Sequence, residues 1–138
     1  MKTYSFEKMI AWEKGKELTL IIYRITGKFP RTEQFGLISQ MNRAAVSVIS
    51  NLAEGSARKS DKDKARFYEI AFGSAIEVLS QTVVSFELNF MTQENYDEIR
   101  SKIDEVCYFM SQLRKPLVDV ANEDGAIYGD EKLPSFEV

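Results

Sequence analysis

The sequence contains no histidine, and this absence excludes several kinds of catalytic site. Without histidine there is no Ser-His-Asp triad, no Cys-His nucleophile pair and no Glu-x-x-His di-iron site of the type found in helical bundles. One cysteine, Cys107, cannot form an internal disulfide or a thiolate cluster around a metal. We therefore expect no catalytic residues, no metal and no cofactor, in a protein that is not an enzyme.

Proline, glycine and long apolar runs are also scarce. Three prolines and seven glycines in 138 residues permit long regular elements. No glycine-rich phosphate-binding motif is present. No apolar run approaches the ~20 residues that a membrane span requires, and the first residues lack the apolar segment of a signal peptide. The sequence therefore predicts a cytoplasmic protein with no membrane partner.

Charge is divided unevenly along the chain. The net charge is −3, but residues 1–66 carry 13 Lys and Arg against 7 Asp and Glu, whereas residues 67–138 carry 5 against 14. The first part is thus basic and the second acidic. Such asymmetry can orient subunits or attract a polyanion to one surface. Solvated helix faces are an equally good explanation of the same pattern.

Apolar residues recur at helical spacing in four segments, near residues 6–26, 33–54, 61–89 and from 92 onward. The fourth segment gives the clearest signal, because its apolar residues repeat at alternating spacings of four and three. Pro116 interrupts this repeat and predicts a kink or an early end of the helix. The repeat consists of Ile99, Ile103, Val106, Met110, Leu113, Leu117 and Val120.

The other three helices have predicted core faces as well. The second helix has a seam of Leu37, Met41, Ala44, Val48 and Leu52. In the third helix, we expect an inward face of Phe67, Ile70, Ala71, Ala75, Val78, Leu79, Val83 and Phe86. Trp12 and Tyr23 of the first helix also fit a core better than a platform for stacking nucleic-acid bases.

Short connections make sequential helices antiparallel neighbours. The predicted fold is all-α, an antiparallel up-down-up-down four-helix bundle formed by residues 1–120. Residues 121–138 form an acidic C-terminal tail, and residues 119–138 together hold six acids and one lysine. Disorder is the first interpretation of this tail. Docking on a neighbouring molecule is the alternative.

A polar stripe lies beside the apolar seam of the second helix, and the third helix has a counterpart. We consider three interpretations: a hydrogen-bond network that organises structure or assembly, a solvated face, and a ligand or catalytic site. If the two stripes meet, Arg43 can pair with Glu77 and Asn51 can bond across the helices. The stripes contain Gln40, Arg43, Ser47, Asn51 and Glu54, and then Ser74, Glu77 and Gln81.

Basic residues crowd the connection between the second and third helices. Five of them, Arg58, Lys59, Lys62, Lys64 and Arg66, fall within nine residues and are interleaved with two aspartates. Basic groups at one end of a bundle can contact the phosphates of RNA or DNA. An ordinary solvated surface is the simpler interpretation of such a stretch.

Several of these positions resemble the four helix bundle protein family, whose members are also called 23S rRNA intervening-sequence proteins. The resemblance implies a small antiparallel bundle assembled into a homopentameric ring. Accessory proteins of diversity-generating retroelements are similar, which implies binding of nucleic acid and reverse transcriptase through a basic surface. This chain departs from that pattern, because its isoelectric point is about 5.1. The matching residues are Trp12, Phe29-Pro30, Glu33, Gly36-Leu37, Gln40, Arg43-Ala44, Ser47, Asn51-Leu52-Ala53-Glu54-Gly55, Phe67, Ala71, Gly73-Ser74 and Glu77.

Together these features predict a non-enzymatic, oligomeric helical-bundle protein that acts as a scaffold or adaptor and binds a macromolecule. Its expected partners are further copies of itself and either nucleic acid or a protein. The alternative is an RNA- or DNA-binding accessory protein that uses the basic residues near the connection of the second and third helices.

Overall fold

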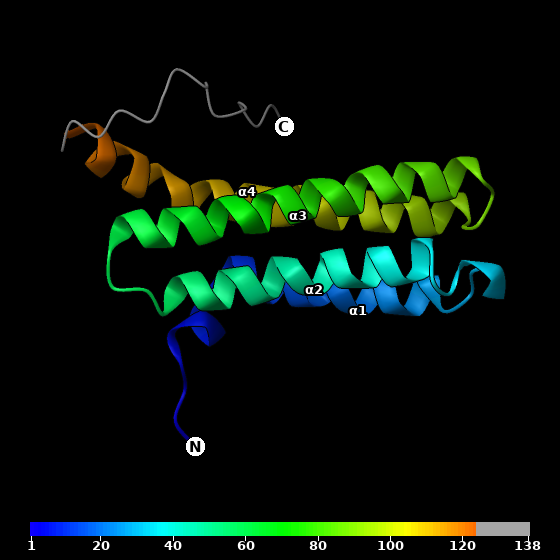
Figure 1. Cartoon of the computed structure of the whole chain (residues 1–138), viewed down its shortest axis with the longest axis horizontal. Coiled ribbons are helices and arrows are strands. Elements are labelled where there is room, and N and C mark those ends of the chain that lie inside the picture. The colour runs from blue at the N-terminus through cyan, green and yellow to red at the C-terminus, as the bar shows by residue number, and fades with distance from the viewer. Residues whose placement is uncertain (124–138) are drawn as a thin grey trace.

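The computed structural model describes residues 1–123, with side chains through Leu117. Four helices make up most of it, α1 (Ile10–Thr26), α2 (Leu37–Ser56), α3 (Asp61–Glu87) and α4 (Gln93–Glu123). No strand occurs in this part of the chain. Figure 1 shows successive helices running in opposite directions, so the predicted all-α up-down-up-down bundle is confirmed. The predictions made for residues 124–138 lie outside the described residues.

Each helix packs against two neighbours. α1 packs on α2 and α4, and α3 packs on α2 and α4, with the most extensive contact between α2 and α3. One hydrophobic core fills the space that the four helices enclose. This arrangement follows from the sequence, because each helix has one apolar stripe that is buried only when the four stripes meet.

The regular seams of α2 and α4 are confirmed for every member whose side chain is described; Val120, the last residue of the predicted α4 seam, lies outside the described side chains. In α2, the side chains of Met41, Ala44, Val48 and Leu52 are buried, and Leu37 is partly buried. In α4, the buried residues are Ile99, Ile103, Val106 and Met110, with Leu113 and Leu117 partly buried. Spacings of three and four residues place such side chains on one face, and that face points into the bundle.

The predicted inward face of α3 is wrong in part. Ile70 and Val83 are exposed, as is Tyr23 of α1. Ala71, Ala75 and Val78 are buried as predicted. The rest of the buried face consists of polar side chains and one tyrosine, which are Tyr68, Ser74, Gln81, Thr82 and Ser85. Small side chains let α2 and α3 approach closely, so hydrophobicity alone does not mark the packed face of this helix.

The first two helices begin later than predicted. Phe6 lies in a short 3₁₀ helix, η1 (Ser5–Lys8), which an extended Met9 separates from α1. A second 3₁₀ turn, η2 (Arg31–Glu33), precedes α2. The carboxylate of Glu33 then accepts a hydrogen bond from the backbone N–H of Leu37, which satisfies a free donor at the start of α2.

Pro116 does not end α4. The helix continues through this residue to Glu123, so the predicted early end is wrong. Figure 1 shows the last turns of α4 leaning away from the line of the preceding turns. Proline removes one backbone hydrogen bond and its ring crowds the preceding turn, which bends a helix without necessarily breaking it.

The connection between α2 and α3 depends on Gly55. A Cβ atom at this position would lie 2.6 Å from Cε1 of Tyr68 and 3.1 Å from Cβ of Phe67. The end of α2 therefore packs directly against the first turns of α3. The hydroxyl of Ser60 caps α3 by accepting a hydrogen bond from the backbone N–H of Asp63. These contacts support the basic connection.

No helix in the described part of the chain is both long and apolar enough to cross a membrane.

Candidate functional site

The polar stripes of α2 and α3 meet at two serines. The hydroxyl groups of Ser47 and Ser74 lie 2.7 Å apart and share a hydrogen bond. The amide of Asn51 donates to the backbone carbonyl and the hydroxyl of Ser47, at 2.8 and 3.1 Å. Asn51 therefore bonds within α2 and not across to α3, contrary to one expectation. This small network lies at the seam between the two helices.

The expected ion pair between Arg43 and Glu77 does not form within the chain. Both side chains are exposed, and Arg43 makes no hydrogen bond or ion pair to any described residue. Glu77 accepts a hydrogen bond from the amide of Gln81 at 3.2 Å. Both side chains are exposed to solvent, where an ion pair gains little free energy.

The remaining members of the stripes differ in their surroundings. Gln40 and Glu54 are exposed on α2. Glu54 accepts a hydrogen bond from Arg58, with 3.1 Å between Oε1 and Nη2. Gln81 is buried, and its carbonyl oxygen has no hydrogen-bond partner in the described chain. The stripe is thus connected at its centre and open to solvent at its edges.

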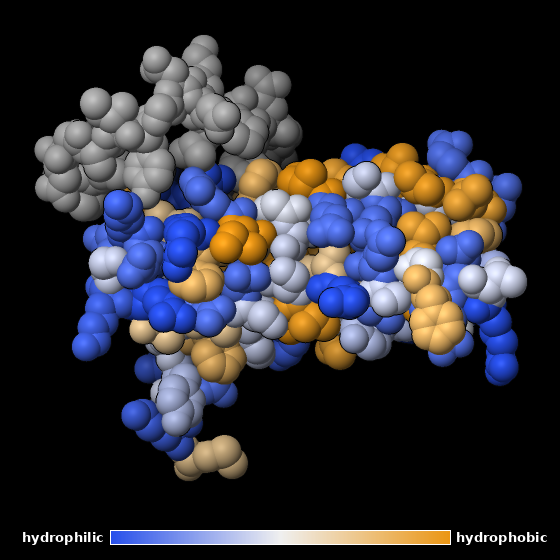
Figure 2. All heavy atoms as spheres, viewed as in Figure 1, coloured by the Kyte–Doolittle hydropathy of each residue, from blue (hydrophilic) through white to orange (hydrophobic). Residues whose placement is uncertain are grey.

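The five basic residues occupy the end of the bundle where α2 passes into α3. Lys64 donates a hydrogen bond to the backbone carbonyl of Ser56 at 3.2 Å and so supports the connection. Lys59 and Lys62 are exposed and pair with no described residue. Arg58 and Arg66 both lie over the ring of Phe67. Figure 2 shows strongly hydrophilic residues gathered at this end, at the left of the view.

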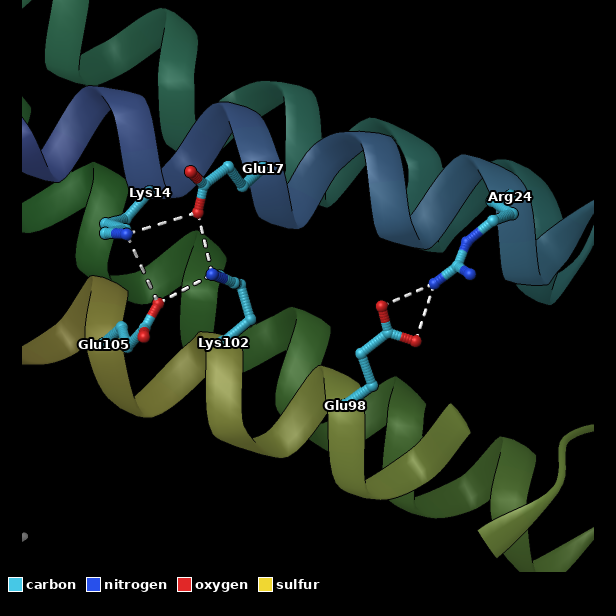
Figure 3. Close-up of polar contacts among 6 residues, drawn as sticks. All are labelled: Lys14, Glu17, Arg24, Glu98, Lys102 and Glu105. Carbon is cyan, nitrogen blue, oxygen red and sulfur yellow. Dashed lines mark hydrogen bonds and ion pairs between the residues drawn. The ribbon is translucent and has the colours of Figure 1, made fainter. Parts of the chain in front are cut away.

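An ion-pair network that the sequence analysis missed joins α1 to α4. Lys102 lies 2.7 Å from the carboxylates of both Glu17 and Glu105, and Lys14 lies 3.5 and 3.9 Å from the same two groups. Figure 3 shows these four side chains forming a closed ring of alternating charge between the helices. The pairs Lys14–Glu17 and Lys102–Glu105 are three residues apart, a spacing that permits contact on one helix face. No sequence signal connects the two helices, however.

The network shifts the pKa values of two of its members, Glu17 and Lys102. The hydrogen bond from Lys102 lowers the pKa of Glu17 below its ordinary value, and the bonds to Glu105 and Glu17 raise the pKa of Lys102. Arg24 donates from Nη2 to both carboxylate oxygens of Glu98, at 2.6 Å each. Each of these carboxylates is held by a cation, so the network fastens α1 to α4 without leaving a free acid or base.

A shallow, open hollow lies beside the network on the α1–α4 face. Its volume is about 490 Å³. The three charged side chains in its wall already have partners: Glu17 pairs with Lys102, and Glu98 pairs with Arg24. Across the described residues, no three His, Cys, Asp or Glu side chains lie together so that they could hold a metal ion. The hollow therefore offers a surface for contact and not a set of convergent reactive groups.

Comparison with known proteins decides the family. The family profile of the 23S rRNA-intervening sequence proteins matches residues 7–112, which is most of the chain. The chain belongs to the 23S rRNA-intervening sequence protein family. All of the polar stripe and all of the basic connection lie inside the matched range. The resemblance noted in the sequence is thereby confirmed.

A crystal structure shows the same fold. It is that of a protein of unknown function from the S23 ribosomal protein family of Bacteroides thetaiotaomicron VPI-5482. The two chains are 19% identical and superpose with a TM-score of 0.61, over 80% of this chain and 97% of the other. No curated protein matches this member of the 23S rRNA-intervening sequence protein family.

Proposed function

We propose that the protein is a non-enzymatic cytoplasmic scaffold or adaptor that self-associates through the outer surface of α2 and α3 and binds a macromolecule. The family resemblance supports a ring of five copies. The observation that carries the proposal is a set of large aliphatic side chains exposed on α3. They are Ile70, Ile76, Val83 and Val84, together with Leu88 at the C-terminal cap of the helix, each more than a third exposed.

These side chains are unusual for a helix that is already packed on two neighbours. Figure 2 shows hydrophobic residues at several places on the visible surface of α3, among hydrophilic ones. Single apolar residues on a surface need no explanation, but four on one helix and a fifth at its C-terminal cap provide a substantial area for burial. Each square ångström of apolar surface removed from water contributes roughly 25 cal/mol, so a contact between copies would gain free energy here.

The polar stripe gives this contact its specificity. Arg43 is exposed on α2 with no partner within the described chain, and Glu77 is exposed on the neighbouring helix α3. Charges at the edge of an interface determine register and exclude wrong partners more than they add affinity. We assign Gln40, Arg43, Glu54 and Glu77 to contacts between copies, and Ser47, Asn51 and Ser74 to alignment of α2 with α3 inside each copy.

An exchange of charges tests this proposal. We expect Arg43→Glu and Glu77→Arg each to weaken association, because each places like charges together. The double variant restores opposite charges and should recover the assembly. Sedimentation velocity at several protein concentrations measures the effect. Arg31→Glu is the matched control, because Arg31 is exposed in η2, away from the α2–α3 surface. If all four variants sediment like the wild type, Arg43 and Glu77 do not contact neighbouring copies.

Binding of RNA or DNA is the second candidate function. The observation in its favour is that Lys59, between α2 and α3, and Lys62, in the first turn of α3, are exposed with no acidic partner among the described residues. The affinity should fall steeply with salt, because binding releases the counterions of the phosphates. We expect Lys59→Glu with Lys62→Glu to abolish binding. The variant Lys28→Glu with Arg31→Glu makes the same change of charge at the other end of the bundle and should retain it.

A further inference from the structure

Two guanidinium groups lie over one aromatic ring at the basic end of the bundle. The central carbons of Arg58 and Arg66 are 4.7 and 5.1 Å from the ring centre of Phe67. A cation over an aromatic face is attracted by the negative charge density of that face. The two central carbons are therefore no more than about 10 Å apart, so both positive charges lie within reach of neighbouring phosphates of one strand.

Neighbouring contacts support this arrangement. Gly55 brings the end of α2 against Phe67, and Lys64 ties the connection to the carbonyl of Ser56. Arg58 is held from a second side by the carboxylate of Glu54 at 3.1 Å. Two arginines that are already oriented lose less conformational entropy when they bind a ligand than two free side chains would.

Most of the donors of these two arginines remain available. A guanidinium group has five N–H donors in a planar fork. In the described chain, Arg58 uses one nitrogen for Glu54, and the contact of Arg66 is with the ring of Phe67. Asp61 and Asp63 are near in sequence, but neither forms an ion pair with either arginine. A paired cationic site with one acidic contact favours an anionic ligand.

We infer that Arg58 and Arg66, held on Phe67, form a clamp for the phosphate groups of an RNA or DNA strand. This inference rests on the second candidate function and names the residues that make its contacts. Planar guanidinium groups match the geometry of phosphate and also offer a flat surface on which bases stack. Lys59 and Lys62 lie on the same connection as point charges that attract the rest of the strand.

A charge-conserving substitution distinguishes binding by the geometry of the two guanidinium groups from binding by their positive charge alone. The variant Arg58→Lys with Arg66→Lys keeps both charges and removes the planar forks and their stacking on Phe67. We expect it to bind labelled single-stranded RNA roughly tenfold more weakly than the wild type, as measured by fluorescence anisotropy at low salt. Phe67→Leu removes the ring without changing charge and should weaken binding likewise. Arg31→Lys makes the same chemical change away from the connection and should have no effect.

The outcomes distinguish the clamp from the function on which it rests. If the double Arg→Lys variant binds like the wild type while the Lys59→Glu/Lys62→Glu variant does not bind, charge alone acts and the clamp is wrong. If the wild type binds neither RNA nor DNA, the clamp and the second candidate function are both wrong. Binding of an acidic polyglutamate chain in place of nucleic acid would overturn the clamp as well. Thermal unfolding of every variant verifies that each one folds, and the Arg→Lys variant remains informative if Phe67→Leu is unstable.

Discussion

The hydroxyl groups of Ser47 on α2 and Ser74 on α3 share a hydrogen bond of 2.7 Å at the seam between the two helices. Ser47 accepts a further bond from Asn51 in the same helix, and Ser74 is buried. Polar groups in a packed seam stabilise it only when they are paired, and a shifted register of the helices would leave them unpaired. The bond therefore aligns the two helices that carry the exposed surface assigned to self-association.

A double-mutant cycle measures this bond. We expect Ser47→Ala and Ser74→Ala each to lower the free energy of unfolding, and the double variant to lose about 1 kcal/mol less than the two single losses together. Urea denaturation provides the measurement. Ser80→Ala serves as the control, because Ser80 is exposed on α3. A coupling energy of zero would show that the two hydroxyl groups do not stabilise the seam.

Replacing each of two glycines by alanine should change the stability of the fold in opposite directions. At Gly55 the new Cβ would meet the ring of Tyr68 at 2.6 Å, so Gly55→Ala should destabilise the fold by about 1–3 kcal/mol. At Gly73 nothing lies within 4 Å of the new atom. Since alanine favours a helix interior, Gly73→Ala should stabilise the fold by roughly 0.5–1 kcal/mol. Thermal unfolding compares the two. Equal stability of both variants would contradict the close packing at the end of α2.

The network between α1 and α4 makes stability depend on pH. The pKa of Glu17 lies below its ordinary value of 4.5, so its contribution is present above pH 4.5 and is lost as the pH falls through the lowered pKa. The pKa of Lys102 lies above its ordinary value of 10.5, so its contribution is present below pH 10.5 and is lost as the pH rises through the raised value.

Lys102→Met should therefore reduce stability most between these two limits. Below pH 4.5, the difference from the wild type should shrink as Glu17 becomes protonated. Urea denaturation over a range of pH measures it, with Lys28→Met as the control because Lys28 forms no ion pair with a described residue. A difference that is constant from pH 3 to pH 9 would contradict the assigned role of the network.

Cys107 should react slowly in the folded protein. Burial, with a smaller contribution from the charge of Asp104, raises the pKa of its thiol from 9.0 to about 11. The reactive thiolate is then roughly 100-fold scarcer near pH 8 than in an exposed cysteine. Labelling with a disulfide reagent in buffer and in denaturant compares the two states. Equal rates in both conditions would show that the thiol is not protected.

The fold could be predicted from the sequence where apolar residues are large and regularly spaced. Met41, Val48 and Leu52 of α2, and Ile99 and Met110 of α4, satisfy both conditions and are buried as predicted. α3 satisfies neither, because much of its inner face is alanine, serine and threonine while aliphatic residues lie outside. Periodicity identifies the helix but not the orientation of such a face.

In the candidate sites, only the residues that share one helix face could be predicted, because helical spacing determines which residues share a face. Ser47 and Ser74 could be placed on facing stripes, and the structure brings them together. Contacts between segments that are far apart in the sequence leave no pattern in residue spacing. Glu17 and Lys102 are 85 residues apart, and nothing in their sequence neighbourhoods indicates the ion pair. The position of Arg58 and Arg66 over the ring of Phe67 likewise depends on how tightly the end of α2 packs on α3.

The central claim is that this bundle works as an assembly of identical copies. The most direct measurement is the native mass of the full chain at micromolar concentration, by light scattering after size-exclusion chromatography. The account predicts one species with a mass five times the 15.8 kDa of a single chain. A stable species of 15.8 kDa that does not change with concentration would contradict it.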